Sequence, residues 1–313
     1  MVKANKKMDG LIKVTEKNTL FICVGAAKAG TSSLHAALSQ HPHIACSSPK
    51  ETDFFISPEA HTKDLEYYFE RYYSPSEDKY AYFEADPIYM YSKDGIRNIH
   101  RHAPEARIII MLRNPVQRAF SQYLYRMTYG RYGESFEKMC LNESNRIQRS
   151  EWDRLEYGCL DRSTYAPQIS EALKYFPRDR VYILLFEDFI RNQEEEVNKL
   201  LKWMGLNEMK LKNVAKNISG KPKSMALARL LLHPKYRFAR RIVSMPLPRS
   251  MARGIYERML KKNLSPFNKN NKPQLSANDA KALMAMFTKD IEEVQAMVKI
   301  DLSEWLSEPL NRK

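Results

Sequence analysis

The sequence lacks the features that mark membrane-spanning and secreted proteins. It contains no apolar run approaching the about 20 residues that a transmembrane helix requires. The segment before Thr19 is charged and has no apolar stretch of roughly 7–15 residues, so it does not read as a secretory signal. We therefore expect a cytoplasmic protein, with docking on a membrane surface as an open alternative.

Metal-binding patterns are also missing. The four cysteines form no C-x-x-C pair, and no H-E-x-x-H motif or His/Cys cluster occurs. Cys23 lies in an apolar run and is expected to be a small core residue. We expect four reduced thiols and no metal cofactor.

Acidic residues are almost absent from one segment. Residues 210–272 hold ten Lys and seven Arg but a single acid, Glu257, whereas the chain has 51 basic and 37 acidic residues in all. The remainder is close to neutral, so the positive charge is concentrated where it can attract anions. We expect one domain over residues 1–313, with residues 224–272 forming a basic, helical insertion or lid.

This basic segment allows several interpretations. It can be a wall or lid with a solvated face, a surface for an anionic glycan, or, over residues 224–262, a peripheral contact with a membrane surface. Nucleic acid is the least favoured partner because few aromatic residues are available for base stacking. The oligomeric state is left open by the sequence.

Strand and helix patterns alternate along the chain. Apolar runs predict strands at 20–25, 80–87, 107–115 and 181–189, and the run of three isoleucines in the third is typical of a strand covered on both faces. Helices are expected over 31–41, 116–127, 163–176, 192–204 and 276–298. The alternation predicts an α/β fold with right-handed crossovers, and the polar stretch 263–273 is expected to be an exposed loop.

The stretch VGAAKAGTSS nearly matches the phosphate-binding P-loop G-x-x-x-x-G-K-[ST]. Gly25, Gly30 and Ser32 occupy matching positions, but Thr31 replaces the motif's lysine, and Lys28 lies three residues earlier. An ordinary strand-to-helix turn is one interpretation. The other is an anion site, in which Lys28 reaches a bridging oxygen of a 5′-phosphate group while the start of the helix supplies N–H and hydroxyl donors.

A second group of candidate ligand-binding residues follows the predicted strand at 107–115, which has the clearest apolar pattern. Arg113 leaves that strand at its carboxyl end, where open α/β sheets bind ligands, and Ser121 lies two helical turns further along. Alone, Arg113 fits a surface ion pair. Combined with the first loop it suggests a second phosphate, as a nucleotide with both 5′- and 3′-phosphates would require.

Together these two motifs resemble those of sulfotransferases that use 3′-phosphoadenosine 5′-phosphosulfate (PAPS), and in particular the heparan-sulfate and carbohydrate sulfotransferases and their bacterial relatives. The likeness covers roughly residues 19–220 and the final DLSEW. The resemblance implies a P-loop-like three-layer α/β sandwich with a central parallel sheet flanked by helices. It also implies PAPS as co-substrate, no metal requirement, and an acceptor hydroxyl on a carbohydrate or glycolipid, with small-molecule and protein acceptors as alternatives.

The resemblance assigns roles by position. It implies that the 3′-phosphate is bound by Arg113 and Ser121, and that a late basic loop contributes Lys221. The 5′-phosphosulfate would be bound by Lys28, Ala29, Gly30, Thr31, Ser32 and Ser33. Lys28 would also act in catalysis, by meeting charge on the leaving oxygen.

A base must take the acceptor's proton. SPKETDFF resembles the family segment in which a glutamate precedes paired aromatics, so Glu51 is the expected base, in a water-poor cleft beside Phe54 and Phe55. Lys50 would orient Glu51 or touch the sulfate. Asp86 is the alternative base. Heparan-sulfate relatives carry a lysine where this chain has Ala85, which weakens the expectation of a heparan-like acceptor.

Two other classes of function stay open at this point. A P-loop nucleotide kinase would need magnesium and a lysine at position 31. A non-catalytic protein that binds anionic glycans or membrane surfaces would rely on the basic segment alone.

Overall fold

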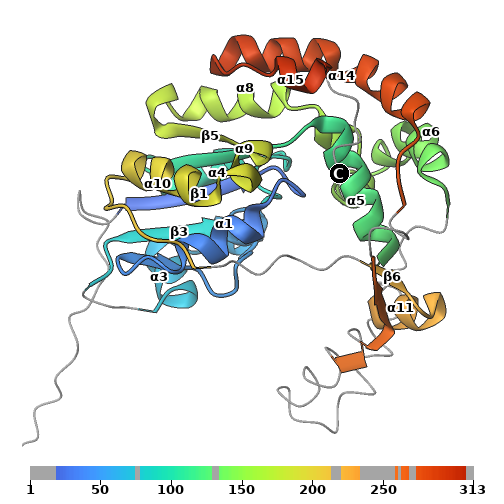
Figure 1. Cartoon of the computed structure of the whole chain (residues 1–313). Helices are drawn as coiled ribbons and strands as arrows, with labels where there is room; N and C mark the ends of the chain where they lie inside the picture. Colours follow the sequence, from blue (N-terminus) through green and yellow to red (C-terminus); the bar gives the residue numbers. More distant parts are fainter. Residues whose placement is uncertain are drawn as a thin grey trace, which may run out of the picture. The chain divides into compact units, whose positions relative to one another are not determined.

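A parallel sheet organises the first part of the structure, a computed structural model (Figure 1). The sheet has five strands in the order β2-β3-β1-β4-β5, and every neighbouring pair is parallel. The strands are β1 (Thr19–Gly25), β2 (Ile44–Cys46), β3 (Ala81–Ala85), β4 (Arg107–Leu112) and β5 (Val181–Leu185). The residues described are 19–74, 78–128, 134–212, 220–232, 258–259, 262–267 and 273–307.

The chain divides into two compact units. The first takes residues 1–113, 165–215 and 296–299, and the second takes 114–164, 216–295 and 300–313. Within the described residues, no helix is both long and apolar enough to cross a bilayer.

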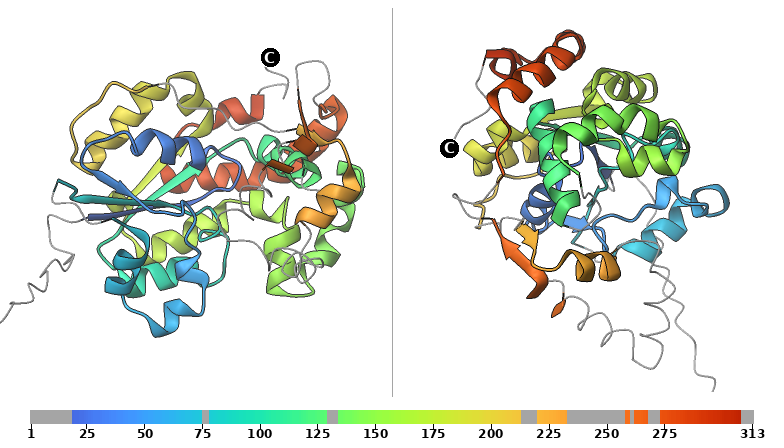
Figure 2. Two further views of the ribbon diagram at one scale, coloured as in Figure 1. Left: turned by 90° about the horizontal axis from the view of Figure 1, so that it is seen from below. Right: turned by 90° about the vertical axis from the view of Figure 1, so that its right-hand side faces the viewer.

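Helices cover both faces of the sheet in the first unit (Figure 2). One face carries α1 (Thr31–Leu38) and α10 (Gln193–Met204), and the other carries α4 (Gly95–His102) and α8 (Ala166–Tyr175). This unit also contains η1 (Phe54–Ile56), α2 (Glu59–Thr62), α3 (Leu65–Tyr72), η3 (Arg178–Arg180) and α9 (Phe186–Arg191). The predicted three-layer α/β sandwich with a central parallel sheet is confirmed.

Burial explains why the central strands could be predicted. From Ile108 to Leu112 no side chain of β4 is exposed, so this strand lies in the core between the two helical layers. The strand predicted at 181–189 was too long, because β5 ends at Leu185 and α9 begins at the next residue. Four cysteines are free, and Cys23 is fully buried in β1 as expected.

The second unit begins with α5 (Pro115–Thr128). Asn114 caps this helix by accepting hydrogen bonds from the N–H groups of Val116 and Gln117, at 3.1 and 3.2 Å, and Pro115 fits the first helical position. The unit also contains α6 (Phe136–Ile147), α7 (Glu151–Tyr157), η2 (Asp161–Ser163), β6 (Gly220–Pro222), α11 (Met225–Leu232), β7 (Leu264–Pro266), most of α14 (Ala277–Val298) and α15 (Ser303–Ser307).

The second unit contains parts of two predicted features, the loop at 263–273 and the helical lid at 224–272. Residues 264–266 form a strand that pairs antiparallel with β6, so the prediction of a loop from 263 onward was wrong there. Asn263 explains the difference, because its side chain is buried and bonds the N–H and carbonyl of Ser224 at 2.9 and 3.0 Å. Helix α11 lies in the predicted helical stretch, but most of the proposed 224–272 lid falls outside the described residues.

A buried arginine fixes the start of this unit. Arg118, one turn into α5, is fully buried and donates to Ser163 Oγ at 2.6 Å, to Gln122 Oε1 at 2.7 Å and to the Cys159 carbonyl. Glu143 on α6 accepts three backbone N–H bonds, each 2.8 Å long, from Cys159, Leu160 and Asp161. Arg118 lies between Arg113 and Ser121 in the sequence, and these contacts give it a structural role.

Candidate functional site

The loop between β1 and α1 is tightly curled. Lys28 has φ 71°, which side-chain-bearing residues rarely adopt, and Gly30 has φ 96°. The Ala26 N–H bonds the Met111 carbonyl of β4 at 2.6 Å, and the Ala29 N–H bonds back to Ala26 at 3.2 Å. Left-handed residues in such loops turn successive N–H groups toward one side and so favour anions.

Helix α1 begins directly after this loop. The N–H groups of Ser33 and Leu34 bond the Gly30 carbonyl, at 2.9 and 3.0 Å, which leaves the donors before them outside the regular helical pattern. Thr31 is buried, whereas Ser32 and Ser33 are half-buried. The loop and the first turn of α1 therefore offer the donors and positive helix end of an anion site.

Gly30 is required for this shape. A Cβ at this position would lie 3.0 Å from Phe186 Cδ2 and 3.3 Å from Met111 Cε, in a backbone conformation that alanine disfavours. We expect Gly30→Ala to lower the free energy of unfolding by about 2 kcal/mol. Gly205→Ala is a matched control, since Gly205 has φ 76° but nothing within 4 Å of the added Cβ. Equal losses in urea unfolding of the two variants would contradict a steric role for Phe186.

Arg113 lies beside the same loop, just beyond the end of β4. Its Nη1 donates to the Lys28 carbonyl at 3.1 Å, and its guanidinium lies 4.4 Å from the centroid of the Phe186 ring. The Arg113 carbonyl accepts a 2.8 Å bond from the Tyr165 hydroxyl. Arg113 and the loop of Lys28 thus lie together at the carboxyl edge of β1 and β4, where ligands bind in open α/β sheets.

The other predicted nucleotide-binding residues fall in different places. Ala29 is fully buried, so it can contribute only through its backbone. Ser121 is a half-buried residue of α5, in the second unit. Lys221 is the middle residue of β6, and its side chain lies outside the described part of the chain.

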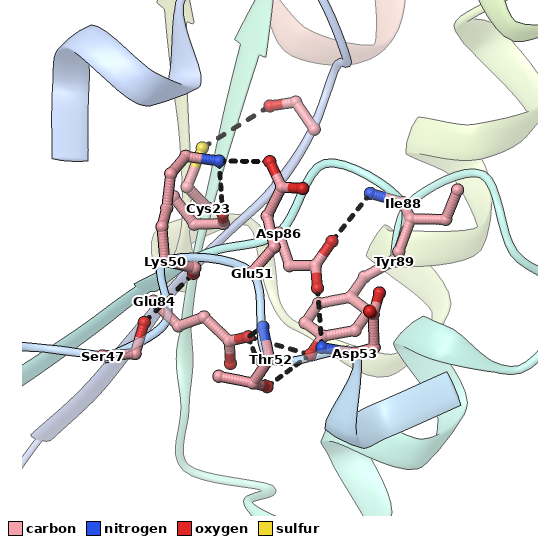
Figure 3. Close-up of polar contacts among 12 residues, drawn as sticks. Cys23, Ser47, Lys50, Glu51, Thr52, Asp53, Glu84, Asp86, Ile88 and Tyr89 are labelled. Atoms are coloured by element: carbon pink, nitrogen blue, oxygen red, sulfur yellow. Dashed lines mark hydrogen bonds and ion pairs between the residues drawn. The ribbon is translucent and has the colours of Figure 1, made fainter. Parts of the chain in front are cut away.

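Glu51 lies on the loop between β2 and η1, and Lys50 is its partner. Lys50 Nζ donates to Glu51 Oε1 at 2.6 Å and to the Ala85 carbonyl at 2.8 Å (Figure 3). The Glu51 side chain is 53% exposed, whereas Phe54 and Phe55 are fully buried in an aromatic cluster. The expected water-poor setting beside these rings was therefore wrong, because the phenylalanines turn into the core and Glu51 turns outward.

Asp86, the alternative base, directly follows β3 but is buried rather than available. Its carboxylate accepts the Asp53 N–H at 3.0 Å and the Ile88 N–H at 3.3 Å (Figure 3). Burial raises the pKa of Asp86 well above its usual range, and the nearby charge of Glu84 adds to the effect. These contacts show Asp86 holding the loop that carries Glu51.

Sequence reasoning missed Glu84, the residue that fixes this loop most strongly. Glu84 is fully buried in β3 and accepts bonds from the Thr52 N–H at 3.0 Å, Thr52 Oγ1 at 2.6 Å, Tyr68 OH at 2.5 Å and Tyr89 OH at 2.9 Å. Burial raises the pKa of Glu84, although these hydrogen bonds oppose the shift. The only available signal was a charged residue inside an apolar strand pattern.

Comparisons with known proteins identify the family and the fold of the chain. A family model described as a sulfotransferase domain matches residues 18–229. A crystal structure of a sulfotransferase from Alicyclobacillus acidocaldarius has a TM-score of 0.67 and 24% identity, covering 92% of this chain and 99% of that one. The chain belongs to the sulfotransferase domain family, as its motifs predicted, and it has that family's fold.

Curated relatives include enzymes named for heparan sulfate. The chain is 27% identical over 215 residues to the human bifunctional heparan sulfate N-deacetylase/N-sulfotransferase 2, covering 65% of this chain and 24% of the relative. It is 25% identical over 189 residues to human heparan sulfate glucosamine 3-O-sulfotransferase 6, covering 60% of this chain and 52% of the relative. It is 30% identical over 136 residues to the membrane-associated sulfotransferase kil1 of Dictyostelium discoideum, covering 41% and 28%. The chain thus spans between a quarter and about half of these relatives.

Proposed function

We propose that the protein is a PAPS-dependent sulfotransferase that transfers a sulfuryl group to an acceptor hydroxyl. The observation that carries this proposal is the meeting of Lys28 and Arg113 at one sheet edge, with 3.1 Å between Arg113 Nη1 and the Lys28 carbonyl. A nucleotide with phosphates at both ends needs two cationic groups near one loop. The tight turn at Gly30 fits this requirement, because it leaves the backbone N–H groups of α1 open to a phosphate.

In this proposal the 5′ end of the nucleotide lies on Lys28, the loop backbone and the hydroxyls of Thr31, Ser32 and Ser33. Arg113 binds the 3′-phosphate, and Ser121 and Lys221 contribute to nucleotide binding. Bound PAPS would supply an activated sulfuryl group with a phosphate as its leaving group. Lys28 would place positive charge beside the leaving oxygen, the role that metal ions fill in phosphoryl transfer.

Glu51 is the proposed base. It would accept the proton of the acceptor hydroxyl as the new oxygen–sulfur bond forms, while the electron pair of the broken bond stays on the leaving phosphate oxygen. Its half-exposed carboxylate is consistent with this role, since an acceptor can approach it from solvent. Asp86 is less well suited, because its oxygens are buried and already bonded to two backbone N–H groups.

The acceptor is proposed to be a carbohydrate or glycolipid, because two of the relatives above are named for heparan sulfate. Ala85 marks a departure from the heparan-sulfate pattern, so small-molecule and protein acceptors belong in any screen.

We propose that both units form one sulfotransferase domain, since the family match runs through both. A cytoplasmic location with peripheral membrane contact through residues 224–262 is likewise a proposal, supported by the membrane-associated relative.

The proposal is tested by incubating the purified protein with ³⁵S-labelled PAPS and a panel of glycan, glycolipid, phenolic and peptide acceptors. We expect label transfer to at least one acceptor without added metal, and a loss of transfer of about 100-fold or more in Lys28→Ala. Thermal protection by MgATP that exceeds protection by adenosine 3′,5′-bisphosphate would instead favour a nucleotide kinase. Glycan binding that survives in Lys28→Ala, without turnover in the wild type, would favour a non-catalytic binding protein.

A further inference from the structure

The Lys50–Glu51 pair differs from an ordinary surface ion pair. The Lys50 side chain is 20% exposed, whereas that of Glu51 is 53% exposed. The ammonium group donates to the Ala85 carbonyl at the end of β3, at 2.8 Å. In most surface pairs both partners are solvated and mobile and contribute little. Here the cation is fixed to the sheet and the anion faces outward.

The backbone on both sides of the pair is also fixed. Ser47 Oγ donates to the Lys50 carbonyl at 3.1 Å, the Thr52 N–H bonds Glu84 at 3.0 Å, and the Asp53 N–H bonds Asp86 at 3.0 Å. Asp53 itself has φ 55°, a strained value for a residue with a side chain. Strain that is held by several contacts is a sign that the local geometry matters for function.

The hydrogen bonds leave one oxygen of Glu51 available. Lys50 holds Oε1, and in the described part of the chain Oε2 has no hydrogen-bond partner. An ion pair that immobilises one oxygen orients the carboxylate and leaves the second oxygen to accept a proton.

Other titratable groups surround the pair on every packed element. They are Cys23 on β1, His35 on α1, Asp53 beside the pair and Asp86 after β3. Burial raises the pKa of Cys23 to about 12, and burial together with the Lys50 charge lowers the pKa of His35. A thiol carries no positive charge in either protonation state, so Cys23 cannot supply one, and the lowered pKa of His35 favours its neutral form. Lys50 is therefore the cation beside Glu51.

We propose that Lys50 is the positioning residue for the base, and that it holds the Glu51 carboxylate oriented with Oε2 directed to the acceptor. This inference rests on the proposed role of Glu51 in sulfuryl transfer. In this proposal the Lys50 ammonium group, held by the Ala85 carbonyl, supplies the positive charge beside Glu51. That charge therefore comes from the loop after β2 and not from a lysine in β3.

The test compares Lys50→Met and Lys50→Arg with a matched control, Lys174→Met. Lys174 forms a similar 2.7 Å pair with Glu171, but on the surface of α8. In transfer assays we expect Lys50→Met to lower kcat about 10-fold or more while leaving the KM for the acceptor within about threefold of the wild-type value. Lys50→Arg should restore much of the lost kcat, and Lys174→Met should match the wild type.

A second readout does not depend on turnover. In protein with ¹³C-labelled glutamate carboxyl groups, the resonance that is lost in Glu51→Gln should change its chemical shift in Lys50→Met relative to the wild type, without any nucleotide, because the ion pair that holds Oε1 is lost. Adenosine 3′,5′-bisphosphate should bind the two proteins with Kd values within about twofold of each other.

Two outcomes would overturn the inference. One is an unmoved resonance together with an unchanged kcat in Lys50→Met. The other is weaker binding of adenosine 3′,5′-bisphosphate with an unchanged kcat, which would make Lys50 a contact of the nucleotide phosphates. Failure of the proposed function is distinct, because a wild type that transfers no sulfate leaves the resonance shift intact.

Discussion

Glu51→Gln is expected to lower kcat by about 100-fold or more while leaving the affinity for adenosine 3′,5′-bisphosphate near that of the wild type. Glutamine keeps the size of the side chain but cannot accept the acceptor's proton. Among the described residues, Glu51 bonds Lys50 and none of the proposed nucleotide-binding residues. Single-turnover transfer from labelled PAPS, with calorimetric titration of the bisphosphate, measures the two quantities separately.

The control for this variant is Glu171→Gln, which breaks the comparable Lys174–Glu171 pair on α8. It should transfer sulfate at the wild-type rate. Normal turnover in Glu51→Gln, together with a folded but inactive Asp86→Asn, would contradict the assignment and make Asp86 the base.

Glu84→Ala is expected to have the largest effect on stability, with a loss of about 3 kcal/mol in the free energy of unfolding. The substitution removes the acceptor of the Thr52 N–H and of the Tyr68 and Tyr89 hydroxyls, all inside a core without water access. The loop carrying Glu51 loses its main anchor at the same time, so kcat should fall as well. Urea unfolding at pH 7 measures the first effect and the transfer assay measures the second.

Glu84→Gln separates the charge of this residue from its shape. Since burial raises the pKa of Glu84 above its unfolded value of 4.5, the folded state holds the proton more tightly than the unfolded state. The stability from Glu84 is therefore fully present below about pH 4 and is lost as pH rises through the folded pKa. Relative to Glu84→Gln, the wild type should lose stability from pH 5 to pH 8. A difference that grows in favour of the wild type over this range would contradict the sign.

The sheet was predictable because its strands are buried on both faces. The apolar runs of β1 and β4 stand out in the sequence, and the glycine turn after β1 and Pro115 after β4 mark where the helices begin. The short edge strand β2 gave no comparable signal, since it has only three residues. The transition from β5 to α9 was missed because the apolar pattern of the strand continues into the helix through Phe186 and Phe189.

The site was predictable where a motif is local and less so where it depends on packing. Lys28 and Arg113 lie at strand ends, so the parallel order of β1 and β4 brings them together. By contrast, the orientation of Glu51 depends on Glu84 and Asp86, which lie more than thirty residues away in the chain. Their role follows only once β3 is known to run beside β1, under the loop from Lys50 to Asp53.

The central claim is that Lys28 and Arg113 bind opposite ends of one doubly phosphorylated adenosine. The most direct measurement is calorimetric titration of the wild type, Lys28→Ala and Arg113→Ala with adenosine 3′,5′-bisphosphate and with adenosine 5′-monophosphate. We expect the wild type to prefer the bisphosphate, Lys28→Ala to weaken both ligands, and Arg113→Ala to weaken only the bisphosphate, by about 10-fold or more. Equal weakening of both ligands by Arg113→Ala, or a wild type without preference for the 3′-phosphate, would contradict the account.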